Sequence, residues 1–398
     1  MKGVTRMREA VIVAAVRTPG GRANKGAFYD TRPEYLGKAC IEAVLSRTCL
    51  DPSDIDDVIW GCATPEQHTG MNIARVTALY AGIPETVPAV TVNRFCSSGL
   101  QAIAFAAEGV LSGRCDVVLA GGVEFMSMGG MGGILRPNPN ILKDPYIRGI
   151  YSTMGATAEN VARRYDVGRT EQDEFAAASH RKAAAATKSG LFKDEIVPVP
   201  VSRTTLGPDG KRVTREWIVD RDEGIRGDTT AEGLGKLPPA FSLNGSVTAG
   251  NSSQTTDGAA AVLVMEKGKA AALGLKPLGK FLGFGVAGCK PDEMGVGPVY
   301  AVPKVLRKTG LSLADIGLVE LNEAFASQSI YCIRQLGLNS DIVNVNGGAI
   351  AIGHPMGATG AKLTATLLYE MRRRDVRYGM VTMCIGGGQG AAGIFELS

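Results

Sequence analysis

The chain repeats one pattern of elements in its first and last thirds. The segment DPSDIDDVIWG, from residue 51, resembles SLADIGLVELN, from residue 312, and each places an acidic helical turn before a strand. A helix then leads into another strand, over Gly99–Ser112 and Val117–Ala120 in the first copy and Gly360–Arg373 and Met380–Cys384 in the second. Because the spacing is nearly equal and strand-like runs alternate with amphipathic stretches, we predict two copies of one α/β unit.

A stretch of different character separates the two copies. It is rich in Gly, Pro and charge, poor in strand patterns, and contains one clear helix, RTEQDEFAAASHRKAAAATKSG. For this helix we expect Thr170 as N-cap, Asp173 in the capping-box position and Gly190 as C-cap. Elsewhere, as in GILRPNPNILKDPYIRG, we expect loops that cover a substrate. The predicted domains are an N-terminal half (1–126 with 251–276), a loop insertion (127–250) and a C-terminal half (277–398).

Composition excludes several classes of protein. With 45% hydrophobic and 21% charged residues, the chain is neither disordered nor fibrous. Its 43 basic and 39 acidic residues form no basic run of the kind that binds nucleic acid. The 52 glycines indicate tight turns and close backbone approaches.

The eight cysteines include no C-x-x-C pair and no histidine at zinc-ligand spacing, so we expect neither a metal site nor a disulfide framework. The first apolar run is broken by Arg17 and Pro19, too early for a signal peptide or membrane span. These observations favour a reducing cytoplasm and no membrane association.

One cysteine lies where an extended run turns into a helix. In TVNRFCSSGLQ, Cys96 is followed by Ser97, Ser98 and Gly99, and then by an apolar helix. The positive end of a helix dipole favours an anion, so we expect the pKa of this thiol to fall below its free value near 8.5. A buried structural cysteine is the commoner role for any one such residue, and the local sequence leaves both interpretations open.

A second candidate is His354, in the glycine-rich segment GGAIAIGHPMGATGAK. Its neighbours Gly353 and Pro355 offer no side-chain cover, which suits a group presented into a site. An ordinary core or surface histidine is the alternative. We assign that ordinary role to the two other histidines, His68 and His180.

Two further segments end strands with polar or reactive groups. In MCIGGGQGAAG a buried strand ends on Cys384 and continues into Gly386, where backbone N–H groups could form an oxyanion hole. A dinucleotide-binding loop would need a following helix and a further strand, and the chain ends too soon for these. In VELNEAFASQ a strand delivers Asn322, which taken alone is most simply a helix N-cap.

Together these segments resemble the thiolases over essentially the whole chain. The motifs occur in that family's order: NRFCSSGLQ, MGATAENVA, TAGNSSQ, LNEAFASQ, GGAIAIGHPMGATG and MCIGGGQGAA. The resemblance implies the α/β thiolase fold, with two duplicated halves whose mixed, parallel-rich sheets sandwich central helices, assembled as a homodimer or homotetramer.

The resemblance also implies site roles. Cys96 takes the acyl group, His354 is its base, Cys384 moves the proton at the α-carbon, and Asn322 orients a water. The N–H groups of Cys96 and Gly386 would hold the acyl oxygen. Coenzyme A is a substrate, no permanently bound cofactor is implied, and its contacts would be Arg226 near the nucleotide, Ser253 near the pantetheine, and Met154 and Phe241 along the tunnel.

Individual residues within the motifs indicate which type of thiolase the chain resembles. NRFCSSG resembles degradative thiolases, whereas biosynthetic ones more often have NQLCGSG, and Thr153 stands where biosynthetic ones tend to have His. The resemblance thus favours a 3-ketoacyl-CoA thiolase of β-oxidation. The alternatives are a biosynthetic acetyl-CoA acetyltransferase and a non-catalytic acyl-CoA or lipid-binding relative. A ketoacyl synthase would be expected to show a second catalytic histidine in place of Asn322. Two thiols in one site also permit a reversible Cys96 to Cys384 disulfide.

Overall fold

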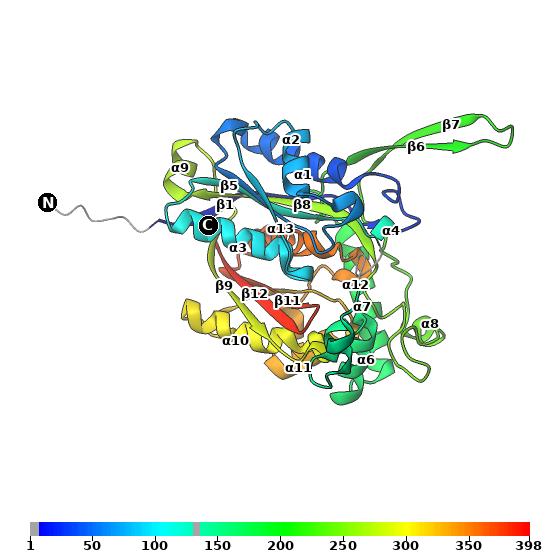
Figure 1. Ribbon diagram of the computed structural model, residues 1–398. Helices are drawn as coiled ribbons and strands as arrows, with labels where there is room; N and C mark the ends of the chain where they lie inside the picture. The colour runs from blue at the N-terminus through cyan, green and yellow to red at the C-terminus, as the bar shows by residue number, and fades with distance from the viewer. Residues whose placement is uncertain (1–7, 130–135) are drawn as a thin grey trace.

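A ten-stranded mixed sheet forms the framework of the molecule (Figure 1). The computed structural model describes residues 8–129 and 136–398. Along the sheet the strands follow the order β10-β11-β12-β9-β1-β8-β5-β3-β4, with β2 paired to β8. The strands are β1 (Ala10–Arg17), β2 (Gly21–Arg22), β3 (Asp57–Gly61), β4 (Ala89–Val92), β5 (Val117–Glu124), β8 (Thr256–Glu266), β9 (Gly279–Gly288), β10 (Leu318–Leu321), β11 (Tyr378–Ile385) and β12 (Gln389–Leu397).

The two halves of this sheet have the same topology, which confirms the predicted repeat. In the first, β3 pairs parallel with β5, and β5 and β1 pair antiparallel with β8. In the second, β10 pairs parallel with β11, and β11 and β9 pair antiparallel with β12. The parallel pairing of β3 with β4 is matched by a bridge between Val319 and Val343. Within the sheet, the halves are joined where Val11 and Ile12 of β1 pair with β9.

Helices fill the space between the two halves and cover their outer faces (Figure 1). Helices α3 (Ser98–Leu111) and α13 (Met356–Arg374) lie in the middle and share one apolar core with strands of both halves. Helix α13 is buried on almost every side, as its small and apolar residues allow. The outer helices are α1 (Pro33–Thr48) and α2 (Ile73–Tyr80) on the first half, and α10 (Gly297–Thr309) and α11 (Ala326–Leu336) on the second.

Short helices complete the two halves. They are η1 (Pro52–Asp54), η2 (Gln67–Thr69), η3 (Phe95–Ser97), α9 (Lys267–Ala272), η5 (Pro291–Val296), η6 (Leu313–Asp315), η7 (Ser340–Ile342) and α12 (Ala349–Ile352).

The central helices approach each other unusually closely. A Cβ atom placed on Gly360 of α13 would lie 2.1 Å from the backbone nitrogen of Leu100 in α3. From the other side, a Cβ atom on Gly99 would lie 2.9 Å from the nitrogen of Ala361. Only glycine permits this crossing, and it brings the N-terminal ends of both helices to one place.

The insertion holds more regular structure than its sequence indicated. Its elements are α4 (Met126–Gly129), α5 (Pro139–Lys143), η4 (Arg148–Tyr151), α6 (Met154–Arg164), α7 (Arg169–Lys188), β6 (Val199–Leu206), β7 (Arg212–Val219) and α8 (Ala231–Gly235). The expectation of few strands was wrong, because β6 and β7 form a hairpin that projects from the body (Figure 1). Most of its residues are exposed, so it lacks the alternation that marks a half-buried strand.

The predicted caps of the insertion helix were also misplaced. Helix α7 begins at Arg169 after Gly168, so Thr170 lies inside it. Asp173 does not cap the helix and instead accepts hydrogen bonds from Arg169 and Asn251. The C-cap is Ser189, and Gly190 follows it with φ +71°.

Two sequence predictions fall partly outside the described residues, those for the first seven residues and for 133–135 of the expected loop. The rest of that loop contains α5 and η4. Among the helices of residues 8–129 and 136–398, none is long and apolar enough to cross a membrane. The domain boundaries predicted above stay our proposal.

Candidate active site

A cavity of about 500 Å³ is lined by both halves and the insertion. The N-terminal half contributes Cys96 and Met126, and the C-terminal half contributes His354 and Met356. The insertion and the segment after it supply much of the remaining lining, including Met154, His180, Arg226, Leu234, Phe241, Ser252, Ser253 and Gln254. The two groups predicted to be nucleophile and base therefore face one cavity, although 258 positions separate them in the sequence.

Cys96 lies in η3, the turn that leads into α3, and only 5% of it is exposed. The preceding Phe95 has φ +43°, an unusual value for a bulky side chain, and such outliers are frequent at functional sites. Burial raises the pKa of the Cys96 thiol to about 11, although N–H groups of Gly386 and of Cys96 itself hydrogen-bond the sulfur. The expected fall in pKa was wrong, because loss of water around the sulfur outweighs the dipole and hydrogen bonds of the turn.

His354 is held at both its backbone and its ring. Its N–H donates to the Thr256 hydroxyl, at 3.1 Å. The ring Nδ1 lies 2.6 Å from Oγ1 of Thr359, and Nε2 lies 3.4 Å from Nδ2 of Asn322. Burial, aided by the charge of Lys362, lowers the pKa of His354 to about 3. The imidazole is therefore neutral near pH 7 and able to accept a proton.

Asn322 is not the helix N-cap that its local sequence indicated. Helix α11 begins at Ala326 with Phe325 as its cap, whereas Asn322 directly follows β10, where its N–H donates to the carbonyl of Thr382. Its side chain is fully buried, and its Oδ1 has no hydrogen-bond partner. An orphaned buried acceptor beside the His354 ring fits a site for a water or a substrate group.

Cys384 lies behind the cavity wall. It is fully buried near the end of β11, in an apolar cluster with Met294 and Phe325, and Met154 packs against this cluster. Burial raises the pKa of the Cys384 thiol well above its usual value, and the neighbouring Cys96 contributes to the rise. The thiol is therefore protonated near pH 7. Gly386, two residues on, brings its N–H to Cys96.

The four residues expected near coenzyme A, Arg226, Ser253, Met154 and Phe241, all line the cavity. His180 lines it as well, which the sequence did not indicate, and its Nδ1 accepts the Arg226 N–H at 3.2 Å. Burial lowers the pKa of His180 to about 4. The signal that could have found it is its position on the buried face of α7.

A buried carboxylate was also missed. Glu124 ends β5 and accepts N–H groups of Ala63 and Thr64 from its own half and of Gly357 from the other. Gly357 lies in the first turn of α13, three residues after His354. A lone acidic residue at the end of the apolar run VVLAGGVE was the available signal. Burial raises the pKa of this carboxyl above its ordinary value.

Within the described residues, no group of three or more His, Cys, Asp or Glu side chains is placed to hold a metal ion. The groups that the structure brings together at this site are thiols, an imidazole, an amide and backbone N–H groups.

Comparisons with known proteins identify the family of the chain. Residues 10–268 match the family described as thiolase, N-terminal domain, and residues 275–397 match thiolase, C-terminal domain. The chain is 55% identical to a 3-ketoacyl-CoA thiolase of Bacillus subtilis, over 98% of this chain and all of that protein.

Two solved structures have the same fold over nearly the whole chain. The dimeric peroxisomal thiolase of Saccharomyces cerevisiae has a TM-score of 0.89 and 40% identity, covering 99% of this chain and 98% of that one. The Bacillus anthracis acetyl-CoA acetyltransferase has a TM-score of 0.88 and 40% identity, covering 98% and 99%. The chain belongs to the thiolase family.

Proposed function

We propose that this chain is an acyltransferase that cleaves 3-ketoacyl-CoA with coenzyme A, giving acetyl-CoA and a shortened acyl-CoA in β-oxidation. The observation that carries the proposal is the pairing of a protonated thiol, Cys96, with a neutral imidazole, His354, in one cavity. Because the thiol pKa is high, a base is required to generate the nucleophile.

The first half-reaction breaks the bond between C2 and C3. His354 accepts the Cys96 proton, and the thiolate attacks C3, whose oxygen is held by N–H groups of Cys96 and Gly386. The C2–C3 bond then breaks with its electron pair moving into an enolate of acetyl-CoA, which His354 and an Asn322-bound water stabilise. Cys384, which the raised pKa keeps protonated, delivers the proton to C2.

The second half-reaction returns the acyl group to coenzyme A. The incoming thiol loses its proton to Cys384, which gave up its own proton in the first half-reaction, and attacks the Cys96 thioester. The Cys96 sulfur leaves as a thiolate and regains its proton from His354. Arg226, Ser253, Met154 and Phe241 are proposed to contact coenzyme A, since all four line the same cavity. No metal or nicotinamide takes part in any of these steps.

Two experiments test the proposal. Incubation with a 3-ketoacyl-CoA should leave an acyl adduct on Cys96, detected by mass spectrometry of the intact protein and its peptides. A folded protein without this adduct would favour a binding protein that lacks catalysis. Turnover of acetoacetyl-CoA and 3-ketodecanoyl-CoA should then be compared, and cleavage of the four-carbon substrate alone would favour an acetyl-CoA acetyltransferase.

We also propose a cytoplasmic homodimer or homotetramer. All eight cysteines are free thiols, as a reducing compartment would keep them. The edge strand β4 exposes Val90, and the neighbouring helix α2 exposes Leu79. Exposed Tyr80 of α2 contacts the ring of exposed Tyr35 of α1, and apolar exposure of this kind favours association. Light scattering coupled to size-exclusion chromatography tests the assembly, and fractionation of the producing cells tests the compartment.

A further inference from the structure

A buried lysine holds the backbone beside the proposed base. Lys362 points from α13 into the interior, only 3% of it is exposed, and its Nζ donates to the carbonyl of Gly353 at 2.6 Å. Gly353 precedes His354 and has φ +89°, a conformation that side-chain-bearing residues rarely adopt. The Gly353 N–H donates to Ala349 and the His354 N–H donates to Thr256, so the Lys362 contact adds a hold on the Gly353 carbonyl, at the point where His354 enters the cavity.

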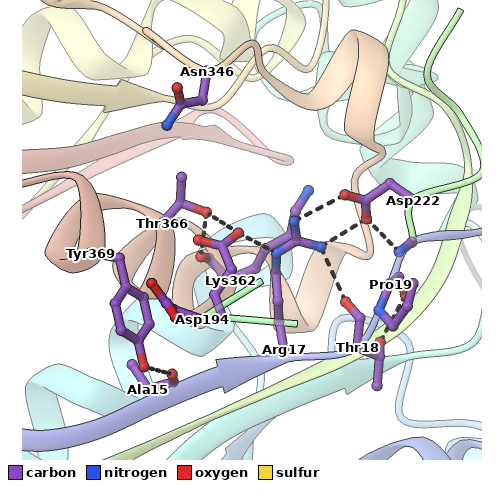
Figure 2. A network of polar contacts seen from close by, with 12 residues as sticks. Ala15, Arg17, Thr18, Pro19, Asp194, Asp222, Asn346, Lys362, Thr366 and Tyr369 are labelled. Atoms are coloured by element: carbon purple, nitrogen blue, oxygen red, sulfur yellow. Dashed lines mark hydrogen bonds and ion pairs between the residues drawn. The ribbon is translucent and has the colours of Figure 1, made fainter. Parts of the chain in front are cut away.

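A cluster of buried charges surrounds this lysine (Figure 2). Arg17 of β1 is fully buried between Glu195, at 2.6 Å, and Asp222, which it contacts at 2.7 and 2.9 Å. Thr366, one turn after Lys362 on α13, donates to Glu195 at 3.0 Å. These contacts join β1, α13 and the two ends of the β6–β7 hairpin behind the His354 turn. Fixed charges in such a cluster cannot move away from a buried ammonium group.

We propose that Lys362 is a positioning residue of the thiolase reaction, which clamps the Gly353 carbonyl and keeps a positive charge behind the His354 imidazole. This inference rests on the proposed role of His354 as base. In this role, the ion-pair cluster of Arg17, Glu195 and Asp222 holds the ammonium group of Lys362 in place.

The charges around the two groups are consistent with this role. Burial lowers the pKa of Lys362 to about 8, with Arg17 adding to the fall. Three acidic side chains oppose the fall, namely Glu195 before β6, Asp222 after β7 and Glu320 on β10. Lys362 is therefore mostly charged at pH 7, and its charge favours the neutral imidazole. The other titratable groups that line the cavity are Arg22, Lys25, Cys96, His180 and Arg226.

Three substitutions separate the clamp from the charge. Lys362→Met removes both, Lys362→Gln keeps a donor without the charge, and Lys362→Arg keeps both. We expect Lys362→Met to lower kcat by about 10²-fold with KM changed little, because a slightly misplaced base loses its alignment. Lys362→Gln should recover part of kcat, and Lys362→Arg most of it.

A second readout follows the imidazole itself. The chain has three histidines, so ring signals in histidine-labelled protein can be assigned with single His→Asn variants. In Lys362→Met and Lys362→Gln the titration midpoint of His354 should move upward by roughly one pH unit. A lysine whose charge does not act on the imidazole would leave that midpoint unchanged in a folded variant.

The matched control is Lys304→Met. Lys304 on α10 also donates to a backbone carbonyl, that of Val286 at 2.7 Å, but it lies outside the cavity. We expect wild-type kcat and an unchanged His354 midpoint. If Lys362→Met does not fold, the Gln and Arg variants carry the same comparison.

The outcomes keep the two hypotheses apart. Wild-type kcat together with an unshifted His354 midpoint in folded Lys362→Gln overturns the role of Lys362, while the function stands. An active His354→Asn variant, or no acyl adduct on wild-type Cys96, overturns the proposed function instead.

Discussion

The two duplicated halves place different groups at the same topological position. A turn leads into the central helix of each half: the turn before α3 carries Cys96, and the turn between α12 and α13 carries His354. Cys96 packs in an apolar cluster with Ala23, Ala63, Met126 and Met356, whereas polar side chains surround His354. The repeat thus supplies two matched positions, and their surroundings determine which becomes the thiol and which the base.

The largest expected effect tests whether the residues of these two turns, Cys96 and His354, serve the same catalytic step. Cys96→Ala and His354→Asn should each lower kcat/KM by at least about 10⁴-fold, since nucleophile and base serve the same step. The double variant should lose little more than either single one. Steady-state kinetics on a 3-ketoacyl-CoA measures this, and losses that multiply would mean that the two turns act separately.

The second test adds volume where the central helices of the two halves cross. Gly360→Ala places a Cβ atom against the Leu100 backbone and should destabilise the protein by about 3 kcal/mol, because backbone cannot give way as a flexible side chain can. Gly235→Ala is the control, since a Cβ atom there meets nothing within 4 Å. Urea unfolding measures both. Equal stability of the two variants would show that the helix crossing tolerates extra volume.

The third test removes a charge that links the halves. Glu124→Gln keeps the shape of the side chain, but it weakens the hydrogen bonds from Ala63, Thr64 and Gly357. We expect a loss of about 2 kcal/mol in stability, with a fall in kcat as the His354 turn loosens. Glu216→Gln, on the exposed face of the hairpin, should change neither quantity. If Glu124→Gln is as stable as the wild type but has a lower kcat, Glu124 aligns the His354 turn without contributing to stability.

The smallest expected effect concerns His180, which lies in the insertion and not in either half. The pKa of His180 is about 4 in the folded protein and near 6.5 when unfolded, so the unfolded state binds more protons between these values. Stability should therefore fall on acidification from pH 6.5. His180→Asn retains an acceptor for Arg226 and should lessen the fall by roughly 1 to 2 kcal/mol at pH 5. Urea unfolding at each pH measures the free energy of unfolding of the wild-type protein and of His180→Asn. If the two change with pH in parallel, His180 does not contribute to the loss of stability.

Several features of the fold and site could be predicted from the sequence because they are local. The acidic turn before each strand, the strand ends and the glycine-rich turns are written in contiguous residues, and they identified the repeat and the family. They also singled out Cys96, His354, Asn322 and Cys384 as candidates. The β6–β7 hairpin was missed because strand prediction depends on a buried face, and this hairpin exposes most of its residues.

Only the tertiary structure decided the pKa values of these groups. The helix dipole predicted a lowered thiol pKa, but burial by segments far away in the chain raises it, since desolvation depends on every neighbour in space. The same long-range packing brings His180 to the cavity and Lys362 behind His354, and no local motif connects either residue with the site. The sequence thus determined which residue types stand at the two helix turns. The packing of one half against the other determined their protonation states, because charge stabilisation is a property of the surrounding volume.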